Sequence, residues 1–462
     1  MPSREEVRKH ASLESCWIII RDAAYDVTSI IGSHPGGPKA ILRYAGNDAT
    51  KAFESVHALD TLTKHLSPKQ HLGPVGNQEG ISGIKMQETK SKRLGPAAKA
   101  ELRAIISIRD FEVAASRRLP PRAFAFLKAG ADDEFTAQWN RDSWKAIRFW
   151  PRVLRPIESV DTSTVILNNS FSAPFFICPA GGAKLIHTEG EVLLTKAAGK
   201  NSILQWVCNM SACSPDEIVR VKRPGQHVYW QIYAANDLEI TKKEVEKAIL
   251  LGFTGIALTV DAIRAGKRER DARAIILEAI ADDDADDDDD DDDDDDSFST
   301  GPTVQRPATW AKFDWDSAIK WLRSITDLPI AIKGIQCWED AELCMKYGVH
   351  PWLSNHAGRQ LEGAPSAVDT LLEIRRRCPK VLEACEVIVD GGVTRGTDIV
   401  KALVLGARAV GLGRGLLFPL AYGEQGVSKA IRILHHEVET AMALVGVSSI
   451  EQLSSLQVRS YL

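Results

Sequence analysis

Short apolar runs alternate with amphipathic segments along the C-terminal two thirds of the chain. Eight of these runs are rich in β-branched and aromatic residues and have the length of buried strands. The eight predicted strands are residues 175–178, 203–207, 229–232, 255–260, 330–333, 352–354, 387–390 and 409–412. Helical periodicity marks segments between them, for example residues 242–251, 315–324, 339–347 and 397–405. Eightfold strand–helix alternation predicts an α/β fold, a (β/α)8 TIM barrel.

A doubly wound parallel sheet is the alternative fold for this alternation. The first strand of such a sheet is normally followed by a G-x-G-x-x-G turn, and residues 175–178 are not. We therefore favour the barrel, with two helical lead-in segments at residues 108–119 and 122–130.

The N-terminal residues follow a different pattern. Two short strands are predicted around a turn, and two helical stretches follow, which is typical of a small α+β domain. These elements are residues 17–20, 24–27, 39–44 and 49–54. Gly, Pro, Lys, Gln and Ser then dominate residues 73–97, as they do in linkers. We predict three parts: a small domain at residues 1–75, a linker at 76–104 and the barrel at 105–462.

Charge is distributed unevenly along the chain. The formal net charge of the 462 residues is −5, yet residues 282–284 and 286–296 supply 14 aspartates, so the remainder carries +9. Like charges at this density repel one another and prevent packing. We expect a disordered acidic loop at residues 281–303, between the fourth and fifth strands. A solvated spacer is the favoured interpretation, and a docking surface for a basic cytochrome c is the alternative.

The eight cysteines are scattered, and none forms a C-x-x-C pair. We therefore expect reduced thiols rather than a disulfide or zinc framework. The sequence contains no apolar run of the about 18–20 residues that span a bilayer. Glu5 and Glu6 make the N-terminus unlike an import signal. These features favour a cytoplasmic protein, and we expect no membrane and no nucleic-acid partner.

Two histidines in the small domain indicate a haem site. His34 opens the string His34-Pro35-Gly36-Gly37, and His57 follows 23 residues later. A haem iron held by two side chains needs two imidazoles across one cleft, and the glycines remove side chains beside a flat ring. With Tyr25-Asp26-Val27-Thr28 and Phe53-Glu54-Ser55-Val56, these strings resemble the cytochrome b5 family. The resemblance implies His34 and His57 as axial ligands of a non-covalent haem b.

The string Ser354-Asn355-His356-Ala357-Gly358-Arg359-Gln360 follows the predicted sixth strand, at the barrel end where catalytic residues lie. Oxidising a 2-hydroxy acid needs a base, and the ordinary pKa of histidine suits His356 to that role. A guanidinium grips a carboxylate through two hydrogen bonds, which suits Arg359. A helix cap with a solvated histidine and arginine is the alternative interpretation.

The C-terminal two thirds of the chain resembles the FMN-dependent 2-hydroxy-acid dehydrogenase family. With the haem-binding domain in front, nearly the whole chain is similar to the cytochrome-linked L-lactate dehydrogenases. The resemblance implies that Asp261 orients His356. It also implies that Arg268 is a second arginine near the substrate and that Tyr233 bonds the substrate hydroxyl. The flavin contacts that it implies are Lys333, Gln231, Thr259, Cys208 and Ala180.

Two glycine loops follow the seventh and eighth strands, where barrels often bind phosphate through backbone N–H groups. The loops contain Asp390-Gly391-Gly392 and Gly413-Arg414. We expect them to bind the FMN phosphate, with added positive charge from Arg395 and Arg414.

Several positions depart from the family pattern. Phe126 stands where the family has a tyrosine whose hydroxyl contacts the substrate carboxylate and helps couple flavin to haem. Cys208 replaces a small hydroxyl residue, and Ala357 replaces the first of two glycines. A weakened or inactive barrel that keeps only the haem electron carrier is therefore an alternative function.

The prediction is an enzyme that oxidises an L-2-hydroxy acid, such as lactate, to the 2-oxo acid through FMN. Electrons then pass to haem b and on to an external acceptor such as cytochrome c. An oxygen-using oxidase is a further alternative, for which a fused haem would be redundant. The resemblance also implies a homotetramer, and it makes the mitochondrial intermembrane space an alternative location.

Overall fold

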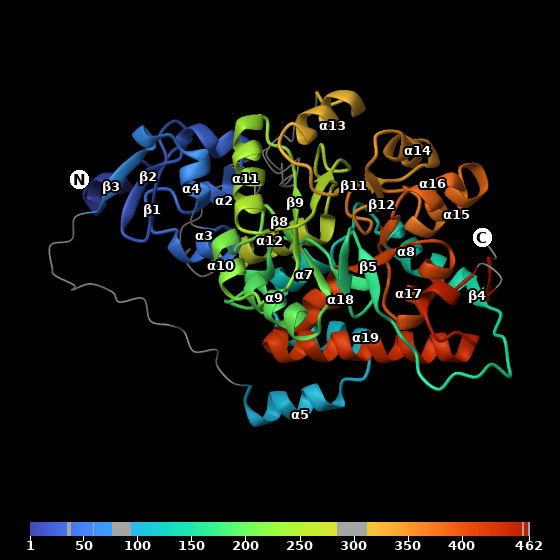
Figure 1. Cartoon of the computed structure of the whole chain (residues 1–462). Coiled ribbons are helices and arrows are strands. Elements are labelled where there is room, and N and C mark those ends of the chain that lie inside the picture. The colour runs from blue at the N-terminus through green and yellow to red at the C-terminus, as the bar shows by residue number, and fades with distance from the viewer. Residues whose placement is uncertain (35–37, 59, 76–93, 284–311, 455–456, 461–462) are drawn as a thin grey trace.

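Eight parallel strands close into a barrel in the computed structural model, which describes residues 1–34, 38–58, 60–75, 94–283, 312–454 and 457–460 (Figure 1). The strands follow one another around the barrel in chain order, and the last pairs with the first. They are β7 (Phe175–Ile177), β8 (Leu204–Cys208), β9 (Val228–Ile232), β10 (Ile256–Thr259), β11 (Ile330–Ile335), β12 (His350–Leu353), β13 (Ile388–Asp390) and β14 (Ala409–Leu412). The predicted TIM barrel and its eight strands are confirmed.

Amphipathic helices surround the barrel because each turns one apolar face toward the strands. In α19, for example, Val427, Ile431, Leu434 and Val438 are buried at intervals of three or four residues. The helices that follow the strands are α9 (Glu191–Lys200), α10 (Pro215–Arg220), α11 (Leu238–Leu250), α12 (Glu269–Asp283), α13 (Trp315–Arg323), α14 (Trp338–Lys346), α15 (Ala367–Arg377), α16 (Lys380–Ala384), α17 (Gly396–Val404), α18 (Arg414–Leu417) and α19 (Gly423–Val445).

The two ends of the barrel differ in chemistry. Phe176, Trp206 and Trp352 fill the interior, and the ring of Trp352 lies 5.2 Å from the rings of both others, centre to centre. A hairpin of β5 (Thr164–Ile166) and β6 (Asn169–Phe171) closes the end where the strands begin, and the Oη of Tyr229 donates to its backbone. The opposite end, where the strands finish, is therefore the end available for chemistry.

The N-terminal domain contains a three-stranded antiparallel sheet with short helices packed on it. Arg21 and Asp22 have φ values of 47° and 58°, as a two-residue hairpin turn between β1 and β2 requires. Ile18, Ile20 and Leu62 belong to its apolar core. Its elements are α1 (Arg4–Arg8), β1 (Trp17–Ile20), β2 (Ala23–Asp26), α2 (Pro38–Leu42), α3 (Thr50–Val56), α4 (Asp60–His65) and β3 (His71–Pro74).

Four helices and a short strand lead from this domain to the barrel. They are α5 (Pro96–Ala104), α6 (Ile108–Arg118), α7 (Pro121–Lys128), α8 (Phe135–Ala146) and β4 (Ile147–Phe149), and β4 pairs with β15 (Val458–Ser460). The predicted linker at 76–104 therefore contains a helix, α5, whose proline at the first turn fits a helix start. Residues 76–93 of that linker lie outside the described residues.

The predicted boundary of the acidic loop is wrong at its start. Helix α12 continues to Asp283, because it is rich in alanine, the residue with the highest helix propensity, and also contains Glu and Arg, which favour a helix. It packs on α7, where Arg122 pairs with Glu278 at 2.8 Å. The rest of the loop predicted at 281–303 lies outside the described residues.

All eight cysteines are free thiols. Among the helices that the structure describes, none combines the length and the apolar character needed to cross a membrane.

Candidate active site

His356 lies in the loop after β12 and is held between two partners. Its Nδ1 is 3.0 Å from Oδ1 of Asp261, and its Nε2 is 3.3 Å from Oη of Tyr233. Because a carboxylate only accepts hydrogen bonds, Asp261 keeps the proton on Nδ1 and leaves the lone pair on Nε2. The side chains of His356 and Asp261 are 14% and 1% exposed. This arrangement suits a base whose reactive atom, Nε2, faces the tyrosine hydroxyl.

The backbone around His356 is held in an unusual conformation. His356 and Ala357 have φ values of 57° and 58°, and Gly358 has 76°. For the two non-glycine residues, His356 and Ala357, this conformation costs about 1–3 kcal/mol each and persists only where the surroundings fix it. Asn355 does so, since its Nδ2 donates to Asn140 at 2.9 Å and its Oδ1 accepts from the N–H of Gly358 at 3.0 Å. The loop therefore presents His356 in one fixed direction.

Neutral backbone carbonyls hold Arg359 in place. Its Nη1 donates to the carbonyl oxygens of Phe126 at 2.9 Å and Ala129 at 2.7 Å, at the C-terminal end of α7. Its guanidinium carbon also lies 5.4 Å from the centre of the Phe126 ring. Carbonyl groups carry no net charge, so these bonds fix the guanidinium without cancelling its positive charge. Burial raises the pKa of the nearby carboxyl of Asp271, and the positive charge of Arg359 acts against that rise.

Gln360 is a site residue that the sequence reasoning did not assign. Its Nε2 donates to the carbonyl oxygens of Asp261 at 3.0 Å and Arg264 at 2.8 Å. Its Oε1 accepts from the N–H of Gly266 at 3.3 Å and lies 3.5 Å from Nη2 of Arg268. One amide therefore ties the loop that carries His356 to the loop that carries Asp261 and Arg268. No local pattern distinguished it, because its partners lie about 100 positions earlier.

Lys333 is a buried cation at the end of β11. It is 6% exposed, and its Nζ lies 3.0 Å from Oγ of Ser354 and 3.6 Å from Oδ2 of Asp390. Asp390 also accepts from Ser354 at 2.7 Å and from Nε1 of Trp352 at 2.9 Å. Burial alone would lower the pKa of Lys333. The nearby carboxylates of Asp390 and Asp261 outweigh that effect, so the pKa lies above its ordinary value. The lysine stays charged, as stabilisation of a developing anion requires.

The ends of β8, β9 and β10 fit the polar edge of a flavin. Nε2 of Gln231 donates to Oγ1 of Thr259 at 2.8 Å. The buried Oε1 atom of Gln231 finds no hydrogen-bond partner among the described residues. An unsatisfied buried acceptor costs about 1–3 kcal/mol, so this oxygen indicates a bound group with N–H or O–H donors. FMN has such donors, and the nearby cation of Lys333 suits its reduced ring.

Two other predicted flavin contacts lie beside these groups in the fold. Cys208 ends β8 and is 3% exposed, and Ala180 lies just after β7 and packs against the main core. Both positions are at the end of the barrel where the strands finish.

Three residues of the predicted phosphate loops interact with protein groups that the sequence did not indicate. The carboxylate of Asp390 pairs with Lys333, so Asp390 belongs to the lysine site. Arg395 pairs with Glu437 of α19 at 2.8 Å. Arg414 donates to the carbonyl oxygens of Lys128 and Ala357 at 3.1 and 2.8 Å. A phosphate contact of Arg395 or Arg414 stays a prediction.

Gly392 has a packing role in the same loop. Its φ is 73°, and a Cβ there would lie 2.0 Å from the carbonyl oxygen of Asn140 on α8. Glycine is therefore needed for the close approach of α8. The backbone N–H groups of Gly391 and Gly413 remain the candidates for the phosphate.

His34 and His57 approach each other in the small domain as two ligands of one metal would. Their ring centres lie 5.8 Å apart. A metal–imidazole bond is about 2 Å long, so two imidazoles on one metal need ring centres roughly 6 Å apart. Burial, and then the charges of His34 and His65, lower the pKa of His57 to about 4, which leaves the neutral form that binds metals. Residues 35–37 lie outside the described residues.

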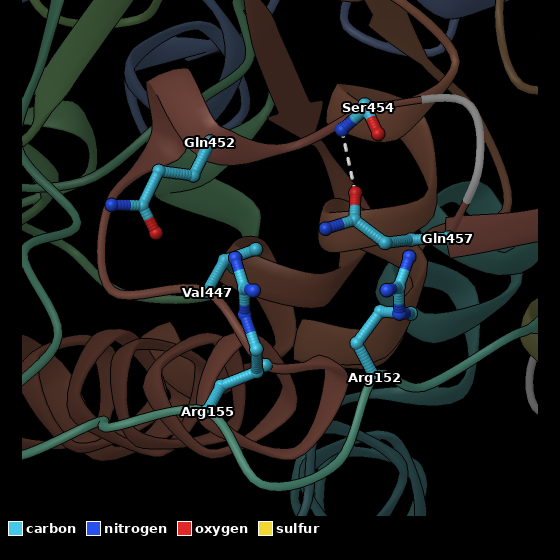
Figure 2. Close-up of a pocket in the computed structure, with 7 residues that line it drawn as sticks. Arg152, Arg155, Val447, Gln452, Ser454 and Gln457 are labelled. Carbon is cyan, nitrogen blue, oxygen red and sulfur yellow. Dashed lines mark hydrogen bonds between the residues drawn. The ribbon is translucent and has the colours of Figure 1, made fainter.

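A separate pocket lies away from these groups. Its volume is about 340 Å³, and Arg152, Arg155, Val447, Gln452 and Gln457 are among the residues that line it (Figure 2). No predicted catalytic or cofactor residue lines it, so it is not the candidate active site.

Comparison with known proteins matches both parts of the chain. Residues 115–460 match the family described as FMN-dependent dehydrogenase, and residues 3–76 match the cytochrome b5-like haem/steroid binding domain. The L-lactate dehydrogenase (cytochrome) of Wickerhamomyces anomalus is 38% identical over 97% of this chain and 78% of its own length. That of Saccharomyces cerevisiae is 34% identical over 98% of this chain and 78% of its own length.

Solved structures agree with these relatives. A mutant flavocytochrome b2 with pyruvate bound has a TM-score of 0.69 at 33% identity, covering 79% of this chain and 90% of its own. A mandelate oxidase has a TM-score of 0.66 at 32% identity, covering 78% of this chain and 100% of its own.

The fold and the site together define a flavin-dependent dehydrogenase with a haem-binding domain in front. The chain belongs to the FMN-dependent dehydrogenase family and carries a cytochrome b5-like domain at its N-terminus. Its cofactors are FMN in the barrel and haem b in the small domain.

Proposed function

We propose that the protein oxidises an L-2-hydroxy acid of lactate size to the 2-oxo acid at the strand ends of the barrel. The observation that carries the proposal is the contact of His356 with Asp261 on one ring nitrogen and with Tyr233 on the other. The relatives named as L-lactate dehydrogenases support the substrate class. Bound FMN would supply the two-electron acceptor and haem b the one-electron carrier.

The protein residues have separate roles in this proposal. Nε2 of His356 accepts a proton that the substrate loses as its hydroxyl-bearing carbon is oxidised, and Asp261 stabilises the imidazolium that results. Tyr233 donates to the substrate oxygen. Arg359 and Arg268 hold the substrate carboxylate. Conversion of the hydroxy acid to the 2-oxo acid releases two electrons and two protons in total.

Other residues would hold the flavin. Lys333 provides the fixed positive charge, Gln231 and Thr259 bond the polar ring edge, and Cys208 and Ala180 line it. The backbone N–H groups of Gly391 and Gly413 would bind the phosphate, and Gly392 would let α8 pack closely against their loop.

We also propose an external one-electron acceptor such as cytochrome c, and a homotetramer as the working assembly. Fusion of a haem-binding domain supports the acceptor, because direct reduction of oxygen would not need it. The free thiols support a reducing compartment such as the cytoplasm.

The variant His356→Gln tests the catalytic proposal. Removing the base should slow flavin reduction by L-lactate by about 10²–10⁴-fold, while the FMN content stays normal. The measurement is anaerobic stopped-flow absorbance, with the exposed His436→Gln as control. Flavin reduction within about threefold of the unmodified protein would contradict the role of His356.

A further inference from the structure

The haem-binding domain touches the barrel at two places that flank His57. Helix α3 ends at Val56, directly before this histidine, and contacts the short helix η3 (Ala183–Leu185) of the barrel. Helix α4 begins at Asp60, just after it, and lies beside α11 of the barrel (Figure 1). The predicted haem ligand therefore lies between two helices that both rest on the barrel.

An ion pair joins α4 to α11. Nζ of Lys64 lies 3.1 Å from Oε1 of Glu244 and 3.3 Å from Oδ2 of Asp60. The side chains of Lys64 and Glu244 are only 24% and 12% exposed. Burial lowers the pKa of Lys64, but the two carboxylates raise it to a net value above the ordinary one. Partial exclusion of water makes such a pair stronger than an exposed one.

Glu244 is itself fixed to the end of the barrel that carries the active site. Its second oxygen, Oε2, accepts from Nδ2 of Asn209 at 2.9 Å. The N–H of Asn209 donates to the carbonyl of Gln231 at 2.8 Å, and its Oδ1 accepts from the N–H of Tyr233 at 3.2 Å. The partner of Lys64 is thus tied to the strand end that supplies both a flavin contact and the substrate tyrosine.

We propose that Lys64 and Glu244 form a docking latch, an ion pair that holds the haem-binding domain on the barrel for electron transfer. Asn209 is the positioning residue for Glu244. The latch rests on the proposed function, because it describes how the two parts meet during turnover. Its structural part is testable without any substrate.

Zero-length cross-linking tests the contact itself. A water-soluble carbodiimide joins a lysine amine to a carboxylate only where the two touch. In the full-length holoenzyme, mass spectrometry should find a peptide that links Lys64 to Glu244, with a yield that falls as salt rises. Glu244→Gln should lose this peptide. Its absence from the unmodified protein at low salt would overturn the latch, whether or not the protein oxidises hydroxy acids.

A double-mutant cycle tests the consequence for electron transfer. Lys64→Met and Glu244→Gln each remove the pair, and the new glutamine can still accept from Asn209. Each variant should slow haem reduction about tenfold, and the double variant also about tenfold, because both changes remove one interaction. Flavin reduction by substrate should stay within about twofold, and the exposed Lys69→Met is the matched control. Unchanged haem reduction in both single variants, or a multiplied loss in the double variant, would overturn the proposal.

Discussion

Each charged group at the candidate site is fixed by a neighbour that sets its charge or direction. Asp261 sets the tautomer of His356, and backbone carbonyls hold Arg359 in place. Asp390 keeps Lys333 charged although the lysine is buried. The side chains proposed to meet the substrate are thus held in place before it arrives, and such preorganisation is a main source of electrostatic catalysis.

Phe126 differs from the tyrosine of the family pattern by one oxygen atom, the missing hydroxyl. Its ring already lies against Arg359. Phe126→Tyr would add a hydroxyl beside the proposed carboxylate site, and a hydrogen bond there is worth about 0.5–1.5 kcal/mol. We expect the KM for L-lactate to fall by about 2- to 10-fold, measured by steady-state kinetics. An unchanged or higher KM would show that the ring does not face the carboxylate.

His356 and Arg359, in the motif after β12, were predictable because both their chemistry and their position at a strand end indicate a catalytic site. Gln360 and the lysine-facing role of Asp390 were not, because each depends on partners that lie far away in the sequence. Arg395 illustrates the same limit. Its positive charge and its place in the loop led us to predict a phosphate contact, but its Nη1 donates a hydrogen bond to Glu437 of α19. A local pattern cannot reveal such long-range pairs.

At the scale of elements, the periodicity of apolar residues located every barrel strand, because buried strands need continuous apolar runs. It did not reveal α5, the full length of α12, or the β5–β6 hairpin that closes the barrel. These elements are short or rich in polar residues, and their stability depends on packing against the rest of the fold. The loops at the strand ends are likewise fixed by α8, whose backbone passes close to Gly392.

The pairing of Glu134 with Arg270 ties the start of α8 to α12 through bonds of 2.9 and 2.6 Å. This pairing, with the N–H of Gly130, lowers the pKa of Glu134 to about 2. A depressed pKa stabilises the fold above the unfolded-state pKa, and the benefit is lost as pH falls toward 2. Because Arg270 is half exposed, we expect Glu134→Gln to cost about 1–2 kcal/mol at pH 7.

The cost of Glu134→Gln should shrink below about pH 4.5. Urea unfolding followed by tryptophan fluorescence at pH 7, 5, 4 and 3 measures this dependence. Glu373→Gln, at an exposed surface pair, is the control. A difference that stays constant from pH 7 to pH 3 would contradict the assigned pairing.

At the scale of the whole molecule, two parts with different cofactors are joined in one chain. The haem-binding domain lies against α11 and η3 of the barrel, on both sides of the predicted ligand His57. This places the electron-accepting domain next to the end of the barrel that carries the site. The fusion therefore serves electron transfer within one molecule.

The aspartate tract at residues 286–296 bears on how the whole molecule meets a partner protein. We expect its deletion to leave both the rate of cytochrome c reduction and the dependence of that rate on salt unchanged, as a solvated spacer would. Stopped-flow kinetics at low and high ionic strength measure this. A slower rate at low salt together with a weaker salt dependence would instead favour a docking surface.

The most direct test of the account is an anaerobic titration of the full-length holoenzyme with L-lactate, followed by absorbance. The account predicts that the flavin band bleaches and that the spectrum of reduced b-type haem then appears in the same molecule. A flavin and haem spectrum unmoved by lactate and by a panel of other L-2-hydroxy acids would contradict it.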